Sequence, residues 1–243
     1  MAEINKEEIL KNAQKFFREV LASNHLRNTK KLVDPKEFNV NPFLINYLAN
    51  YLTGNDTPVN IARVLVYPRI LGTSITTSFG QNSQKFCSEL LGSSGSVTSG
   101  IDIEFEDRID GRKKYAQVKA GPDTLNFDDV ITIKNHFGDL SRRARTNNVL
   151  IANTDMIVGV LYGTQNELSM HYRKLQQDYP VLVGKDFWHR LTGDENFYTD
   201  LIDAFGEVAK ESNAKELIEQ VVQELAKNIM KDARFGYETR SND

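Results

Sequence analysis

Apolar positions in the first 90 residues recur at helical spacing. Across residues 3–22, Ile9, Phe16 and Val20 lie near one side of a 3.6-residue period, which predicts an amphipathic helix. The dipeptide Asn41-Pro42 predicts the start of a second helix that ends near Leu52, because proline suits the first helical turn. We expect a third helix over about 57–70, a break at 71–77 and a fourth helix over 78–91.

The period changes to two residues in the segment GIDIEFEDRIDGRKKYAQVKAG at 100–121. An Asp-Gly dipeptide between two alternating runs predicts a β-hairpin with a two-residue turn. That turn sets the register, so that Asp102 is expected to face Lys119 and Glu104 to face Gln117. The sequence therefore predicts a polar cluster of these four residues near the open end of the hairpin, on one face of the sheet.

Helices and short strands alternate in the second half of the chain. A helix is predicted over 126–146, with Ile131, Ile133, Phe137 and Leu140 partly inward. The apolar run MIVGVLYG at 156–163 is typical of a strand buried on both faces, and PVLVG at 180–184 predicts a shorter strand. Three helices follow, at DFWHRL and at about 195–210 and 214–233.

This order of elements predicts an α/β protein with a mixed central sheet of four to five strands flanked by helices. We expect one domain over 1–243, with a helical N-terminal region (1–92), a sheet core (93–190) and C-terminal helices (191–243). The Gly/Ser-rich stretch at 92–100 lacks the Gly-Lys-Ser/Thr ending of a phosphate-binding loop. It is therefore interpreted as a connector.

Composition narrows the function classes. The longest apolar runs are far shorter than the roughly 20 residues that cross a membrane, and the charged N-terminus lacks the pattern of a secretory signal. We therefore expect a cytoplasmic protein. Cys87 is the only cysteine, which excludes an internal disulfide and a Cys-rich zinc site and predicts a buried apolar role. A formal net charge of −3 indicates no general attraction to a polyanion.

Two interpretations fit the polar cluster. An ordinary sheet face with a cross-strand Asp-Lys pair would contribute a few tenths of a kcal/mol to about 1 kcal/mol. A metal site is the alternative, because both strands end at glycines, Gly100 and Gly121, and the neighbouring side chains offer the oxygen ligands that magnesium prefers.

Asp102, followed on the adjoining strand by Gln117-Val118-Lys119, resembles the PD-(D/E)XK nuclease motif. The context VKAGPDTLN is similar to that of type II restriction endonucleases, and the resemblance extends over the whole chain. Within that group the chain is similar to a branch of small enzymes that includes TdeIII, whose targets are GGNCC-type sites.

The resemblance implies hydrolysis of phosphodiester bonds in double-stranded DNA with Mg²⁺, or Mn²⁺ as a substitute. Asp102 would anchor the metal ion, and Lys119 would contact the attacking water and the scissile phosphate. The products would carry 5′-phosphate and 3′-hydroxyl ends.

One position departs from the family pattern. Gln117 stands where an acidic residue is usual, and its amide oxygen can bind a metal but brings no charge. An ion held by Asp102, Gln117 and the main-chain carbonyl of Val118 would lack negative charge. Glu89 on the preceding helix is the preferred source of a further carboxylate, with Glu104 as the alternative; a solvated, salt-bridged Glu89 is the competing interpretation.

Candidate DNA contacts lie at the hairpin turn, along the predicted 126–146 helix and just beyond the second strand. Basic residues that could reach phosphates are Arg112, Lys113, Lys114, Lys134, His136, Arg142, Arg143 and Arg145. Arginines at a helix C-terminus are also expected on electrostatic grounds alone. Asp123, Thr124 and Asn126 are candidates for contacts with base edges or sugars. The histidines at 136, 171 and 189 show no metal-ligand spacing, and no catalytic role is assigned to them.

The partners that the resemblance implies are double-stranded DNA and a second copy of the chain, so that two equivalent sites meet a near-palindromic target. A cognate DNA methyltransferase is implied genetically, not as a physical partner. Two alternatives stay open: a non-catalytic DNA-binding module with a degenerate nuclease fold, and a DNA repair or junction nuclease.

Overall fold

A computed structural model describes residues 6–90, 96–211 and 214–235 of the chain. Their packing forms two compact units. Unit 1 comprises Met1–Phe17 and Phe79–Val208, and unit 2 comprises Arg18–Ser78 and Ala209–Asp243. The three regions predicted from the sequence (1–92, 93–190 and 191–243) are each continuous, whereas each compact unit combines two segments that are separated in the sequence. None of the helices in the described ranges has the length and apolar character that a bilayer-crossing segment requires.

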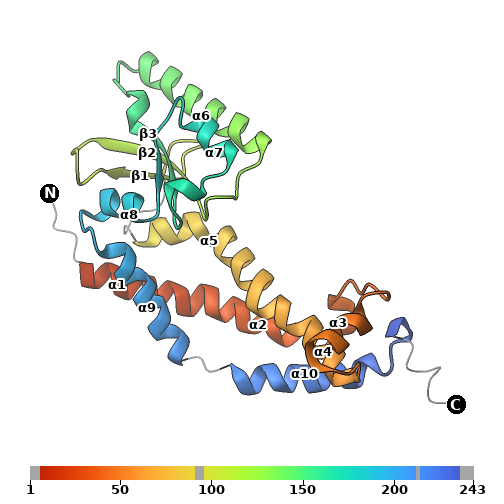
Figure 1. The fold of residues 1–243 in the computed structure, drawn as a ribbon. Coiled ribbons are helices and arrows are strands. Elements are labelled where there is room, and N and C mark those ends of the chain that lie inside the picture. Colours follow the sequence, from red (N-terminus) through yellow and green to blue (C-terminus); the bar gives the residue numbers. More distant parts are fainter. Residues whose placement is uncertain (1–5, 91–95, 212–213, 236–243) are drawn as a thin grey trace, which may run out of the picture. The chain divides into compact units, whose positions relative to one another are not determined.

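Unit 1 contains a four-stranded sheet in the order β1-β2-β3-β4. Figure 1 labels β1, β2 and β3 of this sheet. The strands are β1 (Ile103–Glu106), β2 (Lys113–Lys119), β3 (Met156–Val160) and β4 (Val181–Val183). β1 pairs antiparallel with β2, and β2, β3 and β4 run parallel. The predicted α/β fold with a mixed sheet flanked by helices is confirmed.

Helices cover both faces of this sheet. On one face, α6 (Phe127–Thr146) and α7 (Met170–Leu175) enclose an apolar core that includes Val158, Val160 and Phe137. On the other face, α8 (Lys185–Thr192) places Phe187 directly over Gly159, where an added Cβ would lie 2.3 Å from the ring. Any larger residue at position 159 would therefore displace the helix that covers this face.

The remaining helices are divided between the units. α1 (Lys6–Phe16) and most of α5 (Ile75–Leu90) and α9 (Phe197–Glu211) belong to unit 1. Unit 2 is built around α2 (Ser23–Lys31), α3 (Ile45–Thr53), α4 (Pro58–Pro68) and α10 (Lys215–Ile229). Its core includes Ile61, Val66, Val222, Leu225 and Ile229. Cys87 on α5 is buried, as predicted.

The predicted helix break at 71–77 is wrong. A π-helical segment, Arg69–Ser74, joins α4 to α5 without interruption. Pro68 has no amide hydrogen for the α-helical ladder, and a wider turn accommodates the missing bond without ending the helix. A second π-helical segment, Phe17–Ala22, extends the first predicted helix into α2. Positions 3–5 and 91 of the predicted helices, 92–95 of the predicted connector, and 212–213 and 236–243 of the predicted C-terminal region lie outside the described residues.

The predicted register of the hairpin is also wrong. Ile103 pairs with Ala116, Glu104 with Tyr115 and Glu106 with Lys113, a shift of two positions. The cause is Asp107, whose side chain accepts a hydrogen bond from the Ile109 amide at 2.9 Å and whose carbonyl accepts one from Gly111 at 2.8 Å. These bonds stabilise a longer loop than the predicted two-residue turn. Glu104 therefore does not face Gln117.

α6 begins where the sequence predicts, because Asn126 and Asp129 form a reciprocal capping box. The side-chain oxygen of Asn126 accepts from the Asp129 amide at 2.8 Å, and the Asp129 carboxylate accepts from the Asn126 amide at 3.0 Å. Ile133 and Phe137 are buried as predicted, whereas Ile131 is 45% exposed. Two residues along a helix turn a side chain to nearly the opposite side, so Ile131 and Ile133 do not share a face.

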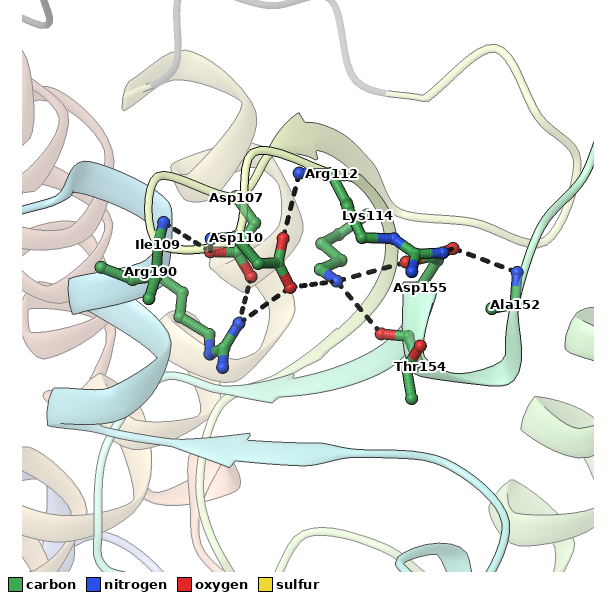
Figure 2. Close-up of polar contacts among 9 residues, drawn as sticks. All are labelled: Asp107, Ile109, Asp110, Arg112, Lys114, Ala152, Thr154, Asp155 and Arg190. Atoms are coloured by element: carbon green, nitrogen blue, oxygen red, sulfur yellow. Dashed lines mark hydrogen bonds and ion pairs between the residues drawn. The ribbon is translucent and has the colours of Figure 1, made fainter.

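A buried ionic network closes the turn end of the hairpin (Figure 2). Lys114, 2% exposed, donates to Asp110 at 2.7 Å and to the buried Asp155 at 3.2 Å. Arg112 also pairs with Asp155, and Arg190 pairs with the fully buried Asp107. Lys114 is therefore engaged inside the protein, whereas the half-exposed Arg112 pairs with Asp155 from the surface.

Lys114→Ala is expected to lower the free energy of unfolding by about 3 kcal/mol, because it leaves a buried carboxylate with one cation fewer. The neighbouring variant Lys113→Ala is the matched control. Lys113 pairs with Glu104 at 2.6 Å, but its side chain is 58% exposed, so the expected cost is about 1 kcal/mol or less. Urea unfolding of both variants measures the difference, and equal costs would contradict a structural role for the buried network.

Candidate active site

The site lies where β1 begins and β2 ends. The amide of Asp102, just before β1, donates to the Ala116 carbonyl at 2.9 Å. Its carboxylate Oδ2 accepts a hydrogen bond from the Val118 amide at 2.7 Å. The carboxylate thus accepts the hydrogen bond that a backbone carbonyl would accept if β1 continued to pair with β2. Because the amide and carbonyl of one strand residue point to the same side, the Val118 carbonyl is directed toward Asp102.

Burial is the main influence on the pKa of the Asp102 carboxylate. Burial raises its pKa above the usual range for aspartate, and this effect outweighs the opposing hydrogen bond from Val118 and the charge of Lys119. The side chain of Gln84 on α5 also donates a hydrogen bond to the carboxylate. Asp102 is therefore a carboxylate held in a partly desolvated position, a common property of functional acids.

Gln117 and Lys119 lie on the sheet face that α6 covers. They pair with Val158 and Val160 of β3, whose side chains belong to the core under α6 and α7. Gln117 is 6% exposed, and its Nε2 contacts the Gly100 carbonyl and His136 Nδ1, the latter at 3.2 Å. The polar face of the hairpin is therefore covered by a helix.

Lys119 is held by the first turn of α6. Its Nζ lies 3.3 Å from Oδ1 of Asp129, and the Lys119 side chain is 24% exposed. Burial alone would raise the pKa of Asp129, but the Asn126 amide and Lys119 together lower it. The predicted Asp102–Lys119 cross-strand pair is thus replaced by a pair with Asp129, although Lys119 still acts electrostatically on Asp102.

Neither additional carboxylate predicted from the sequence contacts Asp102 in the described part of the chain. Glu104 accepts from Ser96 at 2.5 Å and Thr98 at 2.6 Å and pairs with Lys113. Despite the opposing effect of burial, these partners lower its pKa to about 2. Glu89 pairs with Lys85 of the same helix at 3.5 Å. The contact from α5 to Asp102 comes from Gln84 in place of Glu89.

The donor set fits a divalent cation that completes its shell with substrate and water. Among the described residues, no group of three His, Cys, Asp or Glu side chains is close enough to hold a metal ion. Mg²⁺ is nevertheless commonly bound by one or two carboxylates together with substrate phosphates. Asp102, the Gln117 amide oxygen and the Val118 carbonyl would supply one carboxylate and two neutral oxygens.

Most residues predicted to contact DNA form ion pairs or hydrogen bonds with other residues of the same chain. Lys134 pairs with Asp178 at 2.5 Å, and Arg142 pairs with Asp139. Thr124 Oγ1 donates to the Gly121 carbonyl at 2.9 Å and lies 3.0 Å from the Tyr172 hydroxyl. Their assignment to DNA stays a prediction, as do those of Asn126 in the helix cap and of the exposed Asp123 and Arg143.

Sequence reasoning missed Gln84, and it considered His136 only as a possible phosphate contact, not as a partner of Gln117. Neither has a spacing signal, because each reaches the site only after its helix packs beside the hairpin. His136 lies 19 positions from Gln117 in sequence, and Gln84 precedes the loop that leads to Asp102. A single histidine within a predicted helix gives no local signal that distinguishes a site residue from a surface residue.

The mixed four-stranded sheet with its flanking helices is consistent with a restriction-endonuclease-like fold. A family model described as type II restriction endonuclease EcoO109I matches residues 62–213, more than half of the chain. The chain belongs to this family. No curated protein matches the sequence. The match supports the nuclease prediction at family level and leaves the narrower TdeIII-like branch a prediction.

Proposed function

We propose that this protein is a type II restriction endonuclease that hydrolyses both strands of double-stranded DNA at a short, near-palindromic sequence. The observation that carries the proposal is the family match over residues 62–213, which includes Asp102, Gln117 and Lys119 at one end of the β1–β2 pair. Products with 5′-phosphate and 3′-hydroxyl ends are part of the proposal.

Each site residue has a distinct role in this proposal. Bound Mg²⁺ would supply charge neutralisation and water activation, and Mn²⁺ would substitute for it. Asp102 and Gln117, with the Val118 carbonyl, would hold that ion. The Lys119 ammonium would neutralise charge on the scissile phosphate and orient the attacking water. Asp129, 3.3 Å from Nζ, positions the ammonium at the end of β2.

We propose that the active form is a homodimer, because two strands of a near-palindromic target require two equivalent sites. In unit 2, α3 exposes a face of large apolar side chains and carries no charged residue. Its exposed members include Phe43 just before the helix, Tyr47 and Tyr51, which are 89%, 60% and 79% exposed. An uncharged aromatic surface suits a second protein chain better than a DNA backbone.

Incubation of supercoiled plasmid DNA with the full-length protein and Mg²⁺ tests the proposal. We expect discrete linear fragments with 5′-phosphate ends, and no cleavage when EDTA replaces Mg²⁺. Sequencing of the fragment ends would then identify the target and test the GGNCC-type expectation from the TdeIII-like branch.

Other outcomes separate the alternatives. Sequence-specific retention of DNA without cutting would favour the non-catalytic binding module. Cleavage only of branched or damaged DNA would favour a repair or junction nuclease. An adjacent DNA methyltransferase gene would support restriction, because a host must protect its own copies of the target.

A cytoplasmic location is part of the same proposal.

A further inference from the structure

The amide nitrogen of Gln117 meets two acceptors. The Gly100 carbonyl accepts from Nε2, and His136 Nδ1 lies 3.2 Å from the same nitrogen. A primary amide has two N–H groups and one oxygen, so these contacts occupy both hydrogens. The two partners therefore set which end of the side chain is nitrogen and which is oxygen.

The Gly100 contact resolves the orientation. A carbonyl oxygen only accepts, so the amide oxygen of Gln117 cannot take the nitrogen's place beside it. With Nε2 placed there, the second N–H group of the amide is available to Nδ1 of His136, 3.2 Å away. Oε1 of Gln117 is then the end of the amide that is free of both contacts.

Gly100 also allows His136 to approach. Its φ is +83°, and an added Cβ would lie 2.6 Å from Cγ of the imidazole ring. Any side chain at position 100 would therefore push the ring away from Gln117. The loop before β1 and the middle of α6 are thus fitted to each other at the point where Gln117 lies.

We propose that His136 is a positioning residue, which together with the Gly100 carbonyl holds the Gln117 amide so that Oε1 is presented to the metal ion at Asp102. This inference rests on the proposed nuclease function and extends it to a residue that does not itself contact substrate. It explains how a neutral glutamine serves in a position where the family resemblance leads one to expect an acid. Without an oriented amide, Gln117 would present a nitrogen to a cation as readily as an oxygen.

Two substitutions at position 136 separate positioning from packing. His136→Asn retains an acceptor near the place of Nδ1 but removes the ring, whereas His136→Phe retains the ring shape and removes the acceptor. Positioning predicts that His136→Phe loses roughly 10- to 100-fold in single-turnover cleavage, the range for partners of metal ligands, while His136→Asn stays within several-fold of the parent. A packing role predicts the reverse order.

A second measurement does not depend on cleavage. Mn²⁺ binding to the full-length protein with a plasmid-derived DNA duplex, followed by electron paramagnetic resonance, should weaken by about 10-fold or more in His136→Phe and little in His136→Asn. Equal affinities in both variants, or the opposite order, would overturn the positioning role. If the parent binds Mn²⁺ but does not cut DNA, the proposed function fails while this comparison still decides the role of His136.

The outcome stays decisive if His136→Phe does not fold. In that case His136→Asn alone is compared with the parent, because a role in ring packing predicts that this variant also loses melting temperature and cleavage. Near-parental Mn²⁺ binding and cleavage in His136→Asn support positioning, and loss of both overturns it.

Discussion

Asp102→Asn is expected to abolish DNA cleavage and to raise the melting temperature of the protein. Asparagine keeps an oxygen that accepts the 2.7 Å hydrogen bond from the Val118 amide, so the end of β1 retains its geometry. It removes the only carboxylate of the proposed metal-binding set. Burial raises the pKa of Asp102, which means that the ionised form is disfavoured in the folded protein.

The pH dependence of this stability change has a defined sign. The folded-state pKa of Asp102 lies above its unfolded value, so the cost of ionisation is absent below the unfolded pKa of about 3.9. The cost grows as the pH rises from the unfolded pKa to the folded pKa, and it is complete above the folded pKa. The gain in melting temperature from Asp102→Asn should therefore be present at neutral pH and disappear in acid.

Cleavage of plasmid DNA and thermal unfolding, measured on the same preparations, test both expectations. Asp203→Asn, an exposed aspartate on α9, is the control for the loss of one negative charge, and it should leave both properties unchanged. Cleavage by Asp102→Asn at the parental rate would exclude Asp102 from the active site. A fall in melting temperature would show that the carboxylate stabilises the fold.

Lys119→Ala is expected to lower the single-turnover cleavage rate by about 10²- to 10⁴-fold, with a small effect on stability. The Lys119–Asp129 pair is partly exposed on both sides, and such a pair contributes about 1 kcal/mol or less. Lys119→Arg should also cleave slowly, because a planar guanidinium does not replace a compact ammonium beside the attacking water.

Asp129→Asn provides the matched comparison for Lys119. It breaks the same ion pair but retains the ammonium, and an asparagine oxygen can still accept from the Asn126 amide in the helix cap. A chemical role for Lys119 predicts that Lys119→Ala cleaves far more slowly than Asp129→Asn. Equal losses in the two variants would mean that the ion pair, and not the ammonium itself, matters.

Local sequence patterns predict the elements that carry the site. The Asn126 cap and the spacing of Ile133 and Phe137 correctly indicate α6, and the apolar run at 156–163 correctly indicates the buried β3. These signals arise from neighbours within a few residues, where periodicity and capping depend on chain geometry alone. The family resemblance carried by Asp102, Gln117 and Lys119 is likewise readable in one short segment.

The hairpin shows where local rules stop. Asp110-Gly111 is a strong signal for a two-residue turn, but the side chain and carbonyl of Asp107 stabilise a longer loop. Lys114 and Arg190 bind Asp110 and link the loop to other parts of the sheet and to α8. The longer loop thus combines the local bonds of Asp107 with an ion pair to Arg190, a partner that is distant in the sequence.

The sequence by itself determined the α/β class and the elements α6 and β3 beside the candidate site, and it nominated Asp102, Gln117 and Lys119, whose role stays a prediction. Only the tertiary structure decided that α6 covers the polar face of the hairpin, that Lys119 pairs with Asp129, and that Gln84 and His136 reach the site. The physical reason is that periodicity is a property of neighbouring residues, whereas a hydrogen bond between Gln117 and His136 exists only once the helix has packed on the sheet.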